Sequence, residues 1–350
     1  QLFLLCKGST VPVEYLYTYG DFLIDRGSVV EANEYAGKLE SLYPKHFLTM
    51  NLVSRLKYLA GDISRAKGYI LNWKSESLNG LNNEDAPEVR SDILLKAGEA
   101  LFNIKCPREA EELLRQAFDL DDRRGLDYVR TVARSEDVFA REKAIRYLLD
   151  KMRRSNTSSL GQLLAGLLAL GGVSEALERE ADEVLNELGF QNQDNPSLLL
   201  SMADMWLGQR RTNKAIEAYR KIIKISPDDV VSLNNLALLL ADDPSNFEEA
   251  NRLIDRAIEL SGRQPLLLDS KAMIYLFADR PEEAIPLLQA AVSSSSDPRL
   301  MFHLYLAFSR ANRAENAASV LSKIDFNSLR KSVLTPSDRA ELDKIDPQIK

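Results

Sequence analysis

The chain has 350 residues, of which 45% are hydrophobic and 28% are charged, and its formal net charge is −7. An acidic chain lacks the basic footprint of a general nucleic-acid binder, and no apolar run reaches the roughly 18 residues of a membrane-spanning helix. Its two cysteines, Cys6 and Cys106, are too few for a disulfide framework and are not part of a CxxC or Cys/His zinc motif. The composition therefore predicts a soluble, folded segment without direct membrane insertion.

The first residues are expected to end a helix that begins outside this chain. The chain starts at Gln1 rather than Met, which indicates a fragment or a processed product. The apolar stretch at the start of the chain is too short for a signal peptide, and Gly8 is a typical residue at the end of a helix. We therefore interpret residues 1–12 as the end of a preceding helix.

A helical hairpin pattern recurs along the chain. In the stretch from Ala203 to Asp229, two amphipathic segments are separated by a polar break, and Pro227 follows Ala215 in the second segment. Between Tyr19 and Pro44, the same spacing separates Ala32 from Pro44. A small residue at a helix crossing and a proline that ends the second helix explain both positions. The pattern predicts repeated units.

The small residue of the second helix recurs at a nearly constant interval. The alanines in this series are Ala32, Ala66, Ala110, Ala144, Ala176, Ala215, Ala250, Ala284 and Ala317. A period of about 34 residues with helix–turn–helix content resembles the tetratricopeptide repeat. The resemblance is strongest over residues 13–46 and 196–297 and weakest over 125–189. It implies an all-α fold, namely a right-handed superhelical solenoid of about nine stacked helix pairs with a C-terminal capping helix.

The intervals and the composition between repeats predict the domain organisation. The stretch from Lys74 to Glu88 is rich in Asn, Ser, Glu and Gly, which favours a loop, and Thr335-Pro336 followed by Asp338 is typical of a helix start. The predicted parts are repeats over 13–73, an inter-repeat loop over 74–90, repeats over 91–189 that are degenerate from 125, a loop over 190–195, repeats over 196–326, and a capping helix with a tail over 327–350.

The sequence contains no recognisable catalytic or metal-binding motif. Phosphate-binding, dinucleotide-binding, nucleophile-elbow and zinc-protease signatures are all missing. The only histidines, His46 and His303, fall in repeats near opposite ends, so we expect an exposed loop residue and a surface or packing residue of a helix. Paired aspartates such as Asp121-Asp122 fall at repeat ends, where they cap helices. These observations predict no catalytic residue, no metal and no cofactor.

Family resemblance places a groove along the first helix of each repeat. Exposed Tyr and Arg residues are typical binding anchors, so Tyr17, Arg55 and Tyr58 are the preferred candidates. The groove residues expected from this register are Tyr17, Asp21, Asp25, Asn51, Arg55, Tyr58, Asp204, Asn234, Leu238, Asp269, Met273 and Phe277.

The resulting functional hypothesis is a non-enzymatic scaffold that binds a peptide or helix of a partner protein in its concave groove. One alternative is a regulatory or substrate-recruiting arm of a larger enzyme, motivated by the unpartnered N-terminal segment. RNA binding by helical repeats is another, which the acidic pI of about 5.2 disfavours. Loosely matching repeats look more bacterial than eukaryotic. Localisation, cytoplasmic or envelope-associated through a part outside this chain, and oligomeric state stay open.

Overall fold

The protein is all-α in the computed structural model. The structure describes residues 11–82, 87–134, 137–155, 157–192, 194–332 and 334–345. These ranges contain 20 α-helices, two short 3₁₀ helices and no β-strand. In the same ranges, none of the helices combines the length and apolarity needed to cross a bilayer. The expected helix end lies almost wholly within residues 1–10, which are outside the described ranges.

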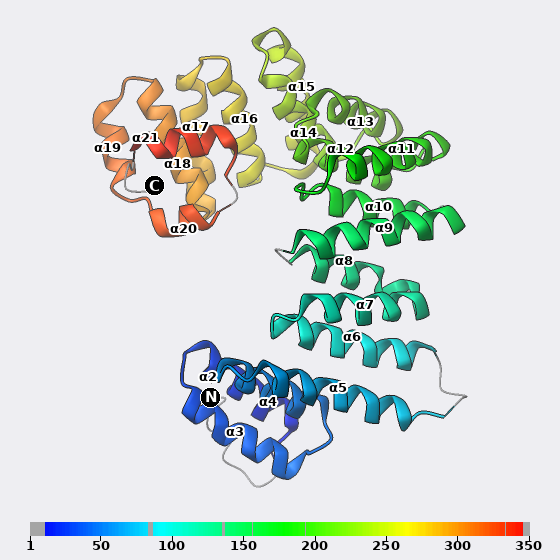
Figure 1. The fold of residues 1–350 in the computed structure, drawn as a ribbon. Helices are drawn as coiled ribbons and strands as arrows, with labels where there is room; N and C mark the ends of the chain where they lie inside the picture. Colours follow the sequence, from blue (N-terminus) through cyan, green and yellow to red (C-terminus); the bar gives the residue numbers. More distant parts are fainter. Residues whose placement is uncertain are drawn as a thin grey trace. The chain divides into compact units, whose positions relative to one another are not determined.

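The helices fall into two compact units, one over residues 1–191 and one over residues 192–350. Figure 1 labels these helices and colours them in sequence order, from blue at the N-terminus to red at the C-terminus. The first unit contains α2 (Val13–Asp25), α3 (Val29–Leu42), α4 (Phe47–Leu59), α5 (Ile63–Asn79), α6 (Pro87–Asn103), α7 (Pro107–Leu120), α8 (Gly125–Ala133), α9 (Val138–Arg154), α10 (Ser158–Leu168) and α11 (Glu175–Gln191). The second contains α12 (Pro196–Gly208), α13 (Thr212–Ile225), α14 (Val230–Ala241), α15 (Phe247–Ser261), α16 (Pro265–Phe277), α17 (Pro281–Ser294), α18 (Pro298–Arg310), α19 (Ala314–Leu321), α20 (Phe326–Lys331) and α21 (Pro336–Ile345).

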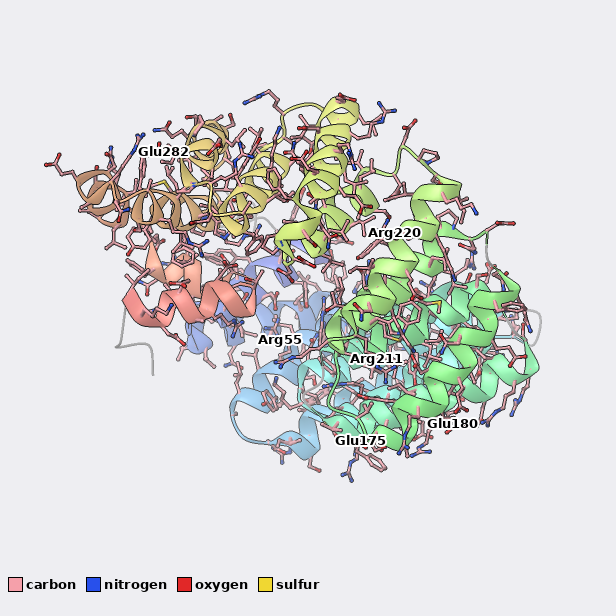
Figure 2. The ribbon with its side chains drawn as sticks, turned by 90° about the horizontal axis from the view of Figure 1, so that it is seen from above. Arg55, Glu175, Glu180, Arg211, Arg220 and Glu282 are labelled. Carbon is pink, nitrogen blue, oxygen red and sulfur yellow. The ribbon has the colours of Figure 1, made fainter. Side chains whose placement is uncertain are left out.

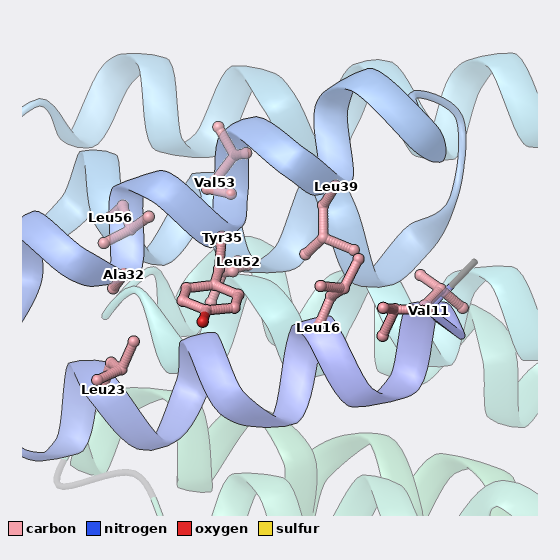
Figure 3. Close-up of a cluster of buried hydrophobic side chains, with 11 residues drawn as sticks. Val11, Leu16, Leu23, Ala32, Tyr35, Leu39, Leu52, Val53 and Leu56 are labelled. Carbon is pink, nitrogen blue, oxygen red and sulfur yellow. The ribbon is translucent and has the colours of Figure 1, made fainter. Parts of the chain in front are cut away.

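Consecutive helices pack in pairs, as α2 with α3 and α12 with α13, and each first helix also packs on the next first helix in most of the chain. Small residues permit this approach. A Cβ atom added at Gly20 of α2 would lie 2.6 Å from a methyl carbon of Leu52 on α4. Leu16, Tyr35, Leu39 and Leu52 fill the space between α2, α3 and α4 (Figure 3). One hairpin therefore buries its apolar stripe against the next, as in a solenoid.

The turn inside the hairpins is fixed by one residue in the left-handed conformation. After that residue the chain hydrogen-bonds back to the first helix, as the Ser28 N–H does to the Leu23 carbonyl at 2.8 Å. In six hairpins this residue lies five positions before a buried alanine. The turn and the alanine at the helix crossing therefore recur together with a fixed spacing. The six residues are Gly27, Gly61, Lys105, Arg210, Asp279 and Asn312.

The predicted series of buried alanines is wrong at one position. Eight of the nine are buried, but Ala176 is exposed in the first turn of α11, and Ala181 is the fully buried residue of that helix. Gly171 and Gly172 both have positive φ angles and lengthen the turn before α11, so the helix crossing moves further along the chain. With Ala181 in the series, the intervals on either side of it become more even and closer to the repeat period. The total of nine repeats stays a prediction.

The predicted loop over 74–90 is too long at both ends. Helix α5 continues to Asn79 and α6 begins at Pro87, which leaves only a short connection between them. Polar residues from Lys74 to Ser77 lie on a part of α5 that follows its last fully buried residue, Ile70. Composition alone does not separate such a helix from a loop. Similarly, α11 runs into the loop predicted over 190–195, up to Gln191.

The C-terminal region holds two helices where one capping helix was expected. Helix α20 is short and buries Leu329. Helix α21 begins after a capping box, in which the Asp338 N–H donates to the Thr335 hydroxyl and the Thr335 N–H donates to the Asp338 carboxylate. The predicted helix start at Thr335 is therefore confirmed.

Candidate functional site

Five of the predicted groove residues come together at the N-terminal end of the first unit. The Nδ2 of Asn51 donates to the Tyr17 hydroxyl at 3.0 Å. The guanidinium of Arg55 forms an ion pair with Asp21 and lies 3.4 Å from a carboxylate oxygen of Asp25. We call these five residues the α2–α4 surface. Tyr17 and Asn51, like Asp21 and Arg55, are one repeat period apart in sequence, so the period itself brings them into contact.

The α2–α4 surface is polar and partly open to solvent. The side chain of Arg55, labelled in Figure 2, is 22% exposed, whereas that of Asp25 is 70% exposed. Burial raises the pKa of the Tyr17 phenol, and the Arg55 charge opposes that shift only in part, so the phenol stays protonated and able to donate. Two carboxylates share one guanidinium, which leaves an excess of negative charge. Tyr58 lies half-buried one turn beyond Arg55 on α4.

An unsatisfied amide oxygen marks the predicted groove in each unit. The Oδ1 atoms of Asn51 on α4 and Asn234 on α14 are buried and accept no hydrogen bond within the described part of the protein. Each asparagine lies three positions before a buried small residue of its own helix, Ser54 or Ala237, so the two occupy equivalent positions. A buried acceptor without a donor is costly and rare.

In the second unit, Asp204 belongs to a short chain of hydrogen bonds. The Tyr219 hydroxyl donates to Asp204 at 3.1 Å, and Nδ2 of Asn235 donates to the Tyr219 oxygen at 3.1 Å. Burial and the Asp204 carboxylate raise the pKa of Tyr219 above its usual range. Asn234 is joined to the chain through its neighbour Asn235. Asp204 and Asn234 are among the groove residues predicted from the sequence, whereas Tyr219 is not.

Asp269 contacts a buried histidine that was not among the predicted groove residues. Nδ1 of His303 lies 2.6 Å from Asp269 on α16, and Nε2 lies 3.4 Å from Asp338 on α21. The His303 side chain is 8% exposed and the Asp338 side chain 6%. We call these three residues the His303 cluster. His303 is therefore a buried polar residue within an ion cluster, which goes beyond the surface or packing role expected for it.

Burial and charge act in opposite directions on the His303 cluster. Burial alone would lower the pKa of His303, but the carboxylates of Asp269 and Asp338 outweigh it and raise that pKa to about 10. Burial would likewise raise the pKa of Asp338, yet the imidazolium and the Thr335 donors lower it below its ordinary value. The cluster therefore holds a cation between two carboxylates at neutral pH.

The remaining predictions have mixed outcomes. Met273 packs half-buried against the core of α16 to α19, so it is a packing residue at least as much as a groove residue. His46 caps α4 by accepting a hydrogen bond from the Leu48 N–H. Asp121 also acts as a cap, accepting from the Arg123 N–H.

The described residues contain no group of three or more His, Cys, Asp and Glu side chains that could hold a metal ion. A cavity of about 880 Å³ in the first unit lies between α7, α9 and α10. Some of its charged side chains pair with one another, as Lys151 does with Asp122 at 3.1 Å. The Tyr147 hydroxyl donates to Asp119 at 2.6 Å in the same wall.

Comparison with known proteins identifies one repeat directly. Residues 198–229, which cover most of α12 and all of α13, match the tetratricopeptide repeat family model. Residues 198–229 therefore form a tetratricopeptide repeat. Tetratricopeptide repeats generally mediate protein interactions and are generally non-catalytic. The bacterial origin expected from the sequence stays a prediction.

Several solved structures are similar to this chain at low identity. A human IFIT1 dimer with PPP-AAAA is 16% identical with a TM-score of 0.48, over 98% of this chain and 83% of that one. The Cut9–Hcn1 complex of APC/C is 13% identical with a TM-score of 0.43, over 89% and 73%. The C-terminal part of a repeat protein from Cytophaga hutchinsonii is 14% identical with a TM-score of 0.40, over 82% and 99%. These similarities assign no partner to this chain, and a search of curated proteins gives no match.

Proposed function

We propose that this protein is a non-enzymatic scaffold that binds a peptide or helix of a partner protein along the first helices of its repeats. The observation that carries the proposal is the pair of buried, unsatisfied amide oxygens of Asn51 and Asn234. A peptide backbone supplies N–H donors at regular intervals, and donation to these oxygens would remove the cost of leaving them unpaired.

The side chains around Asn51 support a protein partner. Tyr17 and Tyr58 offer aromatic surface that is only half-buried, and tyrosine is enriched among residues that contribute strongly to binding. The two carboxylates beside Arg55 leave the α2–α4 surface acidic. We therefore expect the bound segment to carry Lys or Arg where it meets Asp25.

The same charge disfavours a nucleic-acid partner. Phosphate backbones are bound by unpaired Lys and Arg side chains, whereas Arg55 already faces two carboxylates. If RNA were the partner, a labelled single-stranded RNA would be retained by the protein in a salt-sensitive manner. We expect no retention at physiological salt.

The proposal is tested by affinity capture from lysate of the source organism, with bound proteins identified by mass spectrometry. The first bait is the unmodified chain and the second carries Tyr17→Ala, Arg55→Ala and Tyr58→Ala. We expect a protein that the first bait retains and the second loses. The captured protein also decides the alternative of an enzyme arm, because an enzyme substrate or catalytic subunit among the lost proteins would favour it.

A matched control separates loss of the surface from loss of the fold. Val30→Ala, Glu34→Ala and Glu40→Ala change three exposed residues on α3, the second helix of the same hairpin. This bait should retain the partner as the unmodified chain does. Equal retention by all three baits, or equal loss from both variants, would contradict binding at the α2–α4 surface.

A further inference from the structure

Helix α18 is the first helix of the α18–α19 hairpin, and a later segment of the same chain covers it. Phe302 and Leu306 of α18 share a buried cluster with Leu342 of α21. Phe302 has no exposed surface and Leu306 is 6% exposed. Figure 1 shows α21 in red close to α18 in the second unit. We call Phe302, His303 and Leu306 the α18 surface.

The α18 surface occupies the groove positions of its repeat. The buried alanines Ala284 and Ala317 define the sequence interval between the last two hairpins. Asp269 and Met273 are predicted groove residues of α16. The residues that follow them by this same interval, and so occupy the equivalent positions of α18, are Phe302 and Leu306. Helix α21 therefore lies where the proposed function places a partner.

Helix α21 is held by few anchors. Between Asp338 and Ile345 only Asp338 and Leu342 are buried, and they lie one helical turn apart on one face of the helix. Ile345 at the end of the helix packs partly buried against the same cluster. A helix as short as α21 is marginal without such contacts. A cavity of about 540 Å³, lined by Tyr305, Ser309 and Arg310 of α18 among others, stays open beside α21. The surface can accept an occupant with more contacts than α21 makes.

We infer that the α18 surface is a helix-binding site, occupied in cis by α21, whose external occupant is an amphipathic helix with an acidic residue four positions before a leucine. The inference rests on the proposed function, because it assigns a specific class of partner to one part of the same first-helix surface. The acidic residue would take the place of Asp338 against His303, and the leucine that of Leu342 against Phe302 and Leu306.

Charge around the α18 surface selects for an acidic residue at that position. Removing α21 leaves His303 with Asp269 alone, and Arg299 lies near enough to feel both Asp269 and Asp338. A carboxylate from the partner restores the arrangement seen with α21. A lysine at the same position would be buried against His303 and Arg299, which is unfavourable.

The test uses the full chain and a peptide that copies α21. A fluorescent peptide with the sequence of residues 334–345, cross-linked between exposed side chains to hold it helical, is titrated into the unmodified chain and into Leu342→Asp. In the variant α21 is expected to leave the α18 surface. In the unmodified chain the tethered α21 competes at a high effective concentration. We therefore expect saturable binding to Leu342→Asp, at least roughly tenfold tighter than to the unmodified chain.

Two controls keep the outcome decisive. A peptide with lysine in place of Asp338 should bind Leu342→Asp at least about tenfold more weakly, and a second variant, Asp338→Ala, should bind the original peptide if Leu342→Asp loses helix content. No saturable binding to either variant would overturn the inference. So would sedimentation that shows the unmodified chain exchanging α21 within a dimer, because the occupant would then be a second copy.

The outcome is independent of the capture experiment at the other end of the chain. The peptide reports on α18 alone, whereas the capture variants change α2 and α4. Peptide binding without a captured partner would leave the helix site standing and count against the α2–α4 surface. Capture without peptide binding would do the reverse.

Discussion

The first-helix surface is partly exposed to solvent at one end of the chain and covered by another helix at the other end. On the α2–α4 surface, Arg55 and two aspartates are partly exposed, and Asn51 keeps an unused acceptor. On the α18 surface, apolar Phe302 and Leu306 and the His303 cluster are shut away beneath α21. A repeat register fixes which residues face the groove, but it leaves open whether the chain or a partner covers them.

The largest expected difference between the two ends is in stability. His303→Ala leaves the carboxylates of Asp269 and Asp338 buried without their cation, and should lower the free energy of unfolding by about 3 to 5 kcal/mol. Arg55→Ala removes a partly exposed ion pair and should cost no more than about 1 kcal/mol. Urea unfolding followed by fluorescence measures both, since Trp73 lies in the first unit and Trp206 in the second. Equal losses would break the comparison.

The pH dependence of the second unit should follow the His303 cluster. The pKa of His303 is raised from 6.5 to about 10, so its contribution is complete below about pH 6.5 and is lost as the pH rises to about 10, on the order of 5 kcal/mol in all. The lowered pKa of Asp338 acts in the opposite range, because its contribution is present above about 3.8 and is lost at lower pH. Arg299 stays charged throughout.

Unfolding curves of a Trp73→Phe protein between pH 5 and 10 test this dependence. His303→Gln in the same background should flatten the alkaline decline. If both proteins lose the same stability at alkaline pH, titratable groups other than His303 cause that loss.

The hairpin turns offer a smaller, matched test at the two ends. Gly27 has a φ angle of 77° and open space around its Cα, so Gly27→Ala should cost about 1 kcal/mol through backbone strain alone. Asn312 occupies the equivalent turn with a φ of 58°. Asn312→Gly should gain a few tenths of a kcal/mol at most, since asparagine tolerates this conformation. Thermal unfolding compares the two, and stabilisation by Gly27→Ala would refute the shared turn geometry.

Salt should have the smallest effect and should distinguish the two ion clusters. Raising the salt concentration from about 0.05 M to about 0.5 M screens exposed charges but reaches buried ones poorly. The stability difference between the unmodified chain and Arg55→Ala should shrink by a few tenths of a kcal/mol. The stability difference between the unmodified chain and His303→Ala should not change with salt. A decrease as large as that for Arg55→Ala would show that the His303 cluster is solvated.

Much of the fold follows from regular spacing in the sequence. Buried alanines at a nearly constant interval identify the hairpins, and the same interval predicts that Tyr17 meets Asn51 and that Asp21 meets Arg55. Where glycines lengthen a turn, as before α11, spacing fails and Ala181 takes the place predicted for Ala176.

The His303 cluster could not be predicted in the same way, because Asp338 lies beyond the repeats. Its capping box with Thr335 predicts where α21 starts, but the docking place of a helix depends on tertiary contacts with no sequence period. Asp269 and His303 are separated by a repeat period to within one residue, and this separation was the one available signal.

The central claim is that partners bind along the first helices, and site-specific photo-crosslinking tests it most directly. A photoreactive amino acid is placed at Tyr58 on α4 in one protein and at Val30, 80% exposed on α3, in another. Both are irradiated in lysate of the source organism. We predict a discrete protein adduct from position 58 and none from position 30. Adducts from position 30 alone would contradict the account.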